Sequence, residues 1–136
     1  MRRSLVALLF VLLTAGVVCG QTGPAAHEFE LKAGQSVNHD GGRLRIRFVR
    51  VASDSRCPVD VECVWAGNAE VILELRVKGQ RGTKTLRLNT NAGPERPNEG
   101  SYGRYTLKLA GLAPPRRSRQ EIKPRQYTAT LQVTKD

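Results

Sequence analysis

The chain is poor in histidine, methionine and aromatic residues. Its 136 residues include two histidines, one methionine, one tryptophan, three tyrosines and three phenylalanines. His27 and His39 are the only histidines, and Met1 is expected to leave with a signal segment, so the ligand set of a blue-copper site is missing. The aromatic side chains that interleave with basic ones in single-strand nucleic-acid platforms are also missing. We therefore expect no metal site, no cofactor and no nucleic-acid partner.

Local signatures of catalysis are missing as well. Serine, histidine and aspartate are present, but no nucleophile elbow of the Gly-x-Ser-x-Gly type occurs. Asp54, Asp60 and Glu62 cluster near the cysteines without the graded spacing of a calcium-binding loop. His39 and Asp40 precede Gly41, where a turn explains both residues. We expect a protein that is not an enzyme.

The N-terminus has the anatomy of a secretory signal peptide. Arg2 and Arg3 precede an uncharged run over residues 5–18, and small residues follow it. The run is too short and too poorly flanked for a membrane span. We predict a signal peptide over residues 1–20 with cleavage after Gly20, although a site nearer Ala26 is an alternative. Residues 21–136 would form a single exported domain, periplasmic or secreted, with no transmembrane segment.

Export decides how the three cysteines are interpreted. Cys19 would leave with the signal peptide, and Cys57 and Cys63 remain as a pair in an oxidising compartment, which predicts a disulfide bond. So short a ring stabilises a fold by about 2 kcal/mol. The alternative for Cys19 is lipid attachment in a membrane-anchored lipoprotein, but Val18 before it is larger than the residue such signals usually carry.

The net charge is strongly basic. It is +10 for the whole chain and falls to +8 once Arg2 and Arg3 leave. Outside the cell membrane, the anionic partners at hand are lipid headgroups and acidic polysaccharide. The alternative is that the basic side chains form the solvated outer face of a sheet and a solvated loop. The candidates for binding an anionic ligand are Arg43, Arg45 and Arg47 on one strand face, and Arg116, Arg117 and Arg119 in a proline-containing connection.

Alternating apolar and polar residues predict an all-β fold. No stretch shows a sustained helical period, and glycine or proline turns separate short alternating runs. We predict an antiparallel β-sandwich of about six to seven strands, with a partly closed β-barrel as the alternative. The strands are expected at residues 28–32, 43–51, 69–78, 83–88, 105–109 and 127–134, with a further short one at 36–38.

Two segments depart from simple alternation. After Phe48, Val49 and Val51 fall on the parity of the arginines, which indicates either a β-bulge near Phe48 or a covered outer face. The segment from Asn89 to Arg104 is polar, contains several glycines and prolines, and shows no packing pattern, so we expect it to be irregular.

The stretch Asp54–Gly67 contains both mature cysteines and the only tryptophan. Pro58 stiffens the ring, and Gly67 suggests a position that needs positive φ or has no room for a side chain. We expect Trp65 to lie over the disulfide as an apolar plug. The alternative is an exposed indole that serves as a recognition anchor beside the ring.

This stretch resembles a signature found in a family of small exported bacterial proteins, many of them lipoproteins, with no assigned activity. The matching residues are Asp54, Ser55, Arg56, Cys57, Pro58, Cys63, Trp65, Ala66 and Gly67, with looser support from the run starting at Tyr105 and the last run from Tyr127. The resemblance implies a bacterial envelope protein of β type and transfers no catalytic residue.

The function expected from these features is non-catalytic binding or a structural role. The first hypothesis is an envelope module whose basic surface meets an anionic lipid headgroup or polysaccharide. The second is a protein-recognition or protease-inhibitor-like module that presents the Cys57–Cys63 loop, because a preorganised ring loses less entropy on binding.

Overall fold

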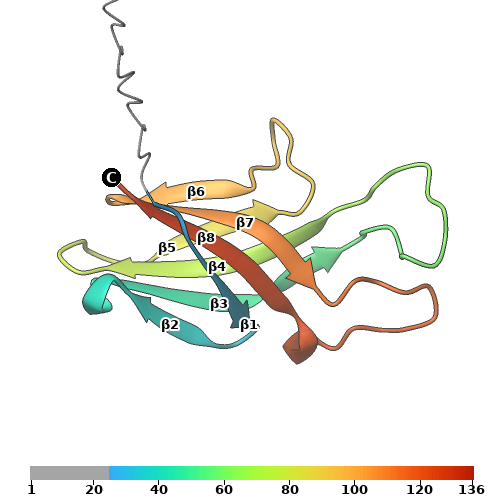
Figure 1. The fold of residues 1–136 in the computed structure, drawn as a ribbon, viewed down its shortest axis with the longest axis horizontal. Helices are drawn as coiled ribbons and strands as arrows, with labels where there is room; N and C mark the ends of the chain where they lie inside the picture. The colour runs from blue at the N-terminus through green and yellow to red at the C-terminus, as the bar shows by residue number, and fades with distance from the viewer. Residues whose placement is uncertain (1–24) are drawn as a thin grey trace, which may run out of the picture.

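The fold is an antiparallel β-sandwich. The computed structural model describes residues 25–136; the predicted signal peptide, its cleavage site and Cys19 lie outside the described residues. Eight strands form two antiparallel sheets of four, and the two sheets do not join into a barrel (Figure 1). The predicted fold class is therefore confirmed.

The first sheet joins the N-terminal strand to the last three strands, and the second consists of the four consecutive strands between them. The first sheet has the order β1 (His27–Lys32), β8 (Thr128–Lys135), β7 (Tyr105–Ala113) and β6 (Glu99–Tyr102). The second has the order β2 (Ser36–His39), β3 (Leu44–Asp54), β4 (Ala69–Val77) and β5 (Lys84–Asn89). Two short 3₁₀ turns, η1 (Asp40–Gly42) and η2 (Pro124–Gln126), precede β3 and β8.

The core lies between the inner faces of the two sheets. Along each strand every second side chain points inward, as the pleat requires. Burial of this apolar surface is the main favourable term in folding. The largest core side chains, all almost fully buried, are Phe48, Leu44, Ile46, Leu73, Leu75, Leu88, Leu107, Leu131 and Tyr105.

The change of parity in β3 is a bulge. The register with β4 shifts between Phe48 and Arg50, and again between Val51 and Ser53. Because of the first shift, Val51 lies opposite the buried Val71 and not on the arginine face. Of the two explanations offered by the sequence, the bulge is the one observed.

The segment from Asn89 to Arg104, which was expected to be irregular, contains the additional strand β6. β6 pairs with β7, and Gly100 lies against the side chain of Leu86 in the other sheet. A built Cβ at Gly100 would come within 2.8 Å of Leu86. The strand was missed because its packing uses a glycine and a half-buried tyrosine, Tyr102, and shows no alternating apolar pattern.

The connections gather at the two ends of the sandwich. The β3–β4 loop (residues 55–68) and the β7–β8 loop (residues 114–127) project from one end, beside the β5–β6 loop (residues 90–98); we call these three loops the loop end (Figure 1). The β4–β5 turn and η1 lie at the opposite end. Among residues 25–136 there is no helix of the length and apolarity needed to cross a membrane.

Candidate binding site at the loop end

The loop end displays all the large exposed apolar side chains of the described chain. Val59, Val61, Val64 and Trp65 are 61%, 45%, 91% and 82% exposed, and all four belong to the β3–β4 loop. We refer to them as the apolar tip. Single exposed apolar residues are ordinary, whereas a group of them on one loop is more typical of interaction surfaces than of the rest of a protein surface.

A disulfide closes the base of the tip. Cys57 and Cys63 are bonded, with their Cα atoms 5.9 Å apart, as the cysteine count predicts. The ring contains Val59 and Val61, and Val64 follows it directly. The bond therefore restricts the backbone that carries the apolar tip.

Arg56 fixes the first half of the loop to the sandwich. Its Nε and Nη2 donate to the two carboxylate oxygens of Asp54 at 2.8 and 2.7 Å. Nη1 and Nη2 also donate to the carbonyl oxygens of Leu112 and Pro114 at 2.6 and 2.9 Å. Both partners of the ion pair are mostly buried, so this bidentate contact ties the β3–β4 loop to the end of β7.

The carboxylate of Asp54 also anchors the start of β8. The hydroxyl of Tyr127 donates to it at 3.0 Å. Burial pushes the pKa of Asp54 upward, but the hydrogen bonds and charge of Arg56 outweigh this effect and hold the pKa below its ordinary value. Burial, followed by the bond to Asp54, raises the pKa of Tyr127. At neutral pH, Asp54 is therefore an ionised carboxylate and Tyr127 a neutral phenol.

The ring is tied a second time to the β7–β8 loop. The carboxylate of Asp60 accepts hydrogen bonds from the backbone amide and hydroxyl of Ser118, at 2.9 and 2.7 Å. These bonds lower the pKa of Asp60. The amide of Val59 donates to the carbonyl of Arg116, and the Arg116 guanidinium donates to the carbonyl of Arg56, both at 2.9 Å.

Gly67 lies at the neck of the β3–β4 loop, where the start of the loop at Ser55 meets its end at Asn68. Gly67 has a φ of 67°, and a Cβ built there would lie 1.9 Å from the carbonyl oxygen of Ser55. Both predicted reasons for a glycine therefore hold. Ser55 closes the neck through hydrogen bonds with Asn68, and Asn68 in turn bonds to Asn89 at the end of β5 and to Asn91 of the β5–β6 loop.

The expectation that Trp65 covers the disulfide is wrong. The indole is 82% exposed, and the disulfide is held by the backbone and by the polar bonds of Arg56 and Asp60. Polar bonds of Arg56 and Asp60 hold the loop to the sandwich, and the indole takes no part in them. The sequence alternative, an exposed anchor beside the ring, describes the observed position.

The apolar tip has charged neighbours of both signs. Asp60 and Glu62 alternate with Val59 and Val61 along the ring, and all four are exposed. Arg116, Arg117 and Arg119 lie close together in the adjoining β7–β8 loop. Such a surface suits a partner with an apolar pocket and a polar rim.

The valines of the tip were not singled out from the sequence. A signal was present, because Val59, Val61 and Val64 lie between two strands in a stretch held by a disulfide, where no alternating partner can bury them. Asp54 and Arg56 appeared only as members of the motif, and their pairing depends on carbonyl groups about 56 and 58 residues further on.

Arg43, Arg45 and Arg47, which were expected on one strand face, do not all lie together. Arg45 lies opposite Arg76 on β4, and Arg47 lies opposite Glu74, with which it forms an ion pair at 3.6 Å. These four side chains line a shallow hollow on the outer face of the second sheet. Arg43 does not continue this face, because its backbone is helical at the end of η1 and its side chain lines a hollow at the other end of the sandwich.

No cluster of three or more histidine, cysteine or acidic side chains within residues 25–136 could hold a metal ion. Asp54 and Asp60 are instead engaged by Arg56 and Ser118. Comparison with known proteins gave no match to any family model, curated protein or solved structure.

Proposed function

We propose that the protein is a non-catalytic binding module of the bacterial envelope that docks the apolar tip into a protein partner. The observation that carries this proposal is the confinement of all large exposed apolar side chains of the described chain to one pinned loop. Tryptophan is enriched among residues that dominate binding energy, and the indole of Trp65 offers a large surface for a partner's pocket.

The rigidity of the loop supports the same function. The disulfide, the Arg56–Asp54 pair and the Asp60–Ser118 contact all restrict the backbone beneath the tip. Because little loop entropy is lost on docking, more of the apolar contact energy is available for affinity.

A protein partner is favoured over a lipid surface. Asp60 and Glu62 alternate with the valines of the ring, and the lowered pKa of Asp60 keeps it ionised. Insertion of the tip among anionic headgroups would bring these carboxylates next to like charges. A protein pocket can meet them with hydrogen-bond donors and place acidic groups near Arg117 and Arg119.

Capture from envelope extract with immobilised mature protein tests the proposal. Trp65→Ala should lose most of the captured protein, because truncating an interface tryptophan costs about 2 kcal/mol or more, which is roughly a thirtyfold loss of affinity. Replacing Cys57 and Cys63 with alanine should weaken capture, and the matched surface control Lys108→Ala should not. Equal capture by Trp65→Ala and Lys108→Ala would contradict the proposal.

A second candidate function uses the outer face of the second sheet. Arg45 and Arg76 lie directly opposite each other, an arrangement that is destabilising unless an anion lies between them. This face suits an acidic polysaccharide or a lipid headgroup. Arg45→Gln with Arg76→Gln should then abolish salt-sensitive adsorption to acidic polysaccharide, whereas Trp65→Ala should not; unchanged adsorption of the double variant would contradict this function.

A further inference from the structure

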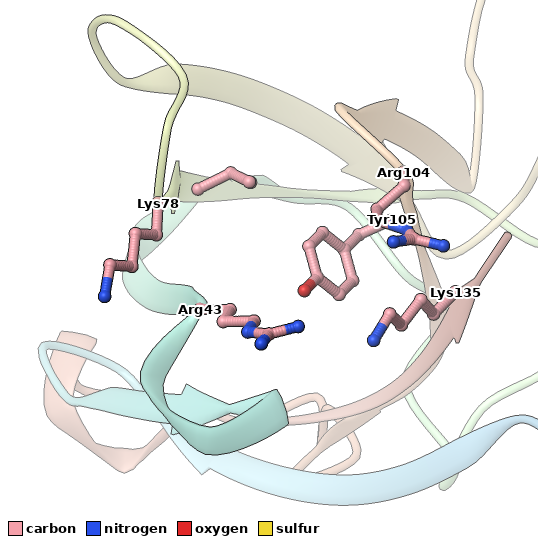
Figure 2. Close-up of a pocket in the computed structure, with 6 residues that line it drawn as sticks. Arg43, Lys78, Arg104, Tyr105 and Lys135 are labelled. Carbon is pink, nitrogen blue, oxygen red and sulfur yellow. The ribbon is translucent and has the colours of Figure 1, made fainter.

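A second hollow, at the opposite end of the sandwich from the apolar tip, is surrounded by cations. It has a volume of about 340 Å³. Figure 2 shows the charged ends of Arg43 and Lys135 and the hydroxyl of Tyr105 directed toward a common space, whereas the guanidinium of Arg104 lies beyond the Tyr105 ring and the ammonium of Lys78 points outward. The residues that line it are Arg43, Val77, Lys78, Arg104, Tyr105 and Lys135, and we call it the cationic hollow.

Both sheets contribute to the cationic hollow. Arg43 follows η1 and Lys78 follows β4 in the second sheet, whereas Arg104 precedes β7 and Lys135 ends β8 in the first. The amide of Lys78 donates to the carbonyl of Arg43 at 2.8 Å, which holds these two residues side by side. The cations are thus positioned by the ends of rigid strands.

Two of the four cations have structural partners. Asp40 Oδ2 accepts a hydrogen bond from Lys135 at 2.8 Å and another from the hydroxyl of the buried Tyr105. Arg104 donates through Nε and Nη2 to the carbonyl oxygen of Asp136, at 2.8 and 2.6 Å. Asp40 is therefore occupied, and it balances only one positive charge of the hollow.

The other two cations are available to a ligand. Among residues 25–136, the side chains of Arg43 and Lys78 take part in none of the ion pairs or hydrogen bonds of the fold. A guanidinium fork suits two oxygens of one oxyanion, and a lysine adds a mobile point charge. A recess lined by charges of one sign also concentrates ions of the opposite sign.

We propose that the cationic hollow binds a phosphate monoester group, with Arg43 as the residue that holds its oxygens and Lys78 as a flexible cation at the rim that turns toward them. A dianion balances two of the three positive charges left after Asp40 is counted, whereas a carboxylate balances only one. Lys135 contributes its charge while bonded to Asp40, and Tyr105 fixes Asp40 in place. The phosphate belongs either to a soluble metabolite or to a lipid headgroup.

Amide chemical-shift titration of the mature protein with phenyl phosphate at about 0.15 M salt tests the site. We expect saturable shifts at the amides near Arg43, Lys78 and Lys135. Arg43→Gln should weaken binding about tenfold, because one hydrogen-bonded charge contact contributes roughly 1.4 kcal/mol. Acetate should bind more weakly than phenyl phosphate.

The matched control is Arg50→Gln with Lys108→Gln, which removes two exposed cations that line neither hollow and leaves the cationic hollow intact. Its affinity for phenyl phosphate should equal that of the wild type. Shifts that spread over all basic surfaces without saturation, or equal weakening by the control, would overturn the proposal. Because none of these residues belongs to the apolar tip, failure here leaves the proposed docking function intact.

The source of the phosphate is decided by vesicles. If the wild type sediments with vesicles that contain phosphatidic acid and Arg43→Gln does not, the ligand is a headgroup with a terminal phosphate. Saturable binding of phenyl phosphate without sedimentation would identify a soluble monoester. Absence of both would overturn the proposal.

Discussion

Replacing Arg56 with methionine should destabilise the protein strongly, because it removes the polar anchor of the β3–β4 loop. Methionine keeps an unbranched apolar stem but leaves Asp54 without its bidentate partner and the carbonyls of Leu112 and Pro114 without their donor. The side chains of Arg56 and Asp54 are 15% and 8% exposed, so water cannot fully replace the lost contacts. Breaking a buried pair in this way costs about 3 kcal/mol.

The pH dependence identifies the ion pair as the cause. In the wild type the pKa of Asp54 lies below its ordinary value of 3.8, so the stabilisation is complete above that value and is lost as the pH falls through the folded-state pKa. In Arg56→Met, burial no longer has an opposing charge and raises the pKa of Asp54. Protonation of Asp54 then removes the unpaired buried charge from the variant. The difference in unfolding free energy between the two proteins should therefore shrink toward a pH of about 3.

Urea unfolding of both proteins at neutral and acid pH measures this difference. Arg117→Met is the matched control, because Arg117 lies exposed on the adjoining loop and its side chain forms none of the described bonds. The control should change the unfolding free energy by less than about 0.5 kcal/mol. A loss of under about 1 kcal/mol in Arg56→Met, typical of an exposed ion pair, or a loss independent of pH would refute the reasoning.

Three further predictions concern the same loop. Trp65 is the only tryptophan, so native fluorescence should be strongly quenched by acrylamide and should emit close to the wavelength of the unfolded chain; a blue-shifted, protected signal would contradict its exposure. Gly67→Ala should lower the unfolding free energy by more than about 2 kcal/mol in urea, because the new Cβ meets the carbonyl of Ser55; wild-type stability would show that the neck can relax. Reduction of the Cys57–Cys63 bond should lower the unfolding free energy by about 2 kcal/mol without unfolding the domain, and an unchanged urea midpoint would be the contrary result.

Most of the sandwich could be predicted from sequence because its strands each have one buried face. The alternation is regular in β8 and is broken in β4 only at the buried Ile72, so both strands and their inner sides are defined. The break in alternation near Phe48 also had a structural meaning, since the bulge there is what returns Val51 to the core. Local pattern and tertiary packing agree in these elements.

β6 could not be predicted because its packing depends on a distant strand. Gly100 is required by the approach of Leu86, which lies 14 residues earlier and in the other sheet. The same limit applies to Arg43, which shares its parity with Arg45 but not its face, because η1 turns the backbone just before β3 begins. The alternation of apolar and polar residues within one strand shows neither the approach of Leu86 nor the turn of the backbone at η1.

The loop end shows why residue type alone misplaced Trp65. A tryptophan beside a disulfide is expected to be buried, since its apolar area is large. Here the loop is held by charged and polar groups, and the partners of Arg56 lie about 56 and 58 residues away in sequence. The fold therefore does not need the indole, and the indole remains available for binding.

Crosslinking from position 65 tests whether Trp65 anchors a protein interface. A photoreactive phenylalanine analogue is placed at position 65, and in a second protein at position 108, an exposed site on β7. After irradiation in envelope extract, we predict a discrete crosslinked protein from position 65 and none from position 108. The same pattern of products from both positions, or no protein product from position 65, would contradict the account.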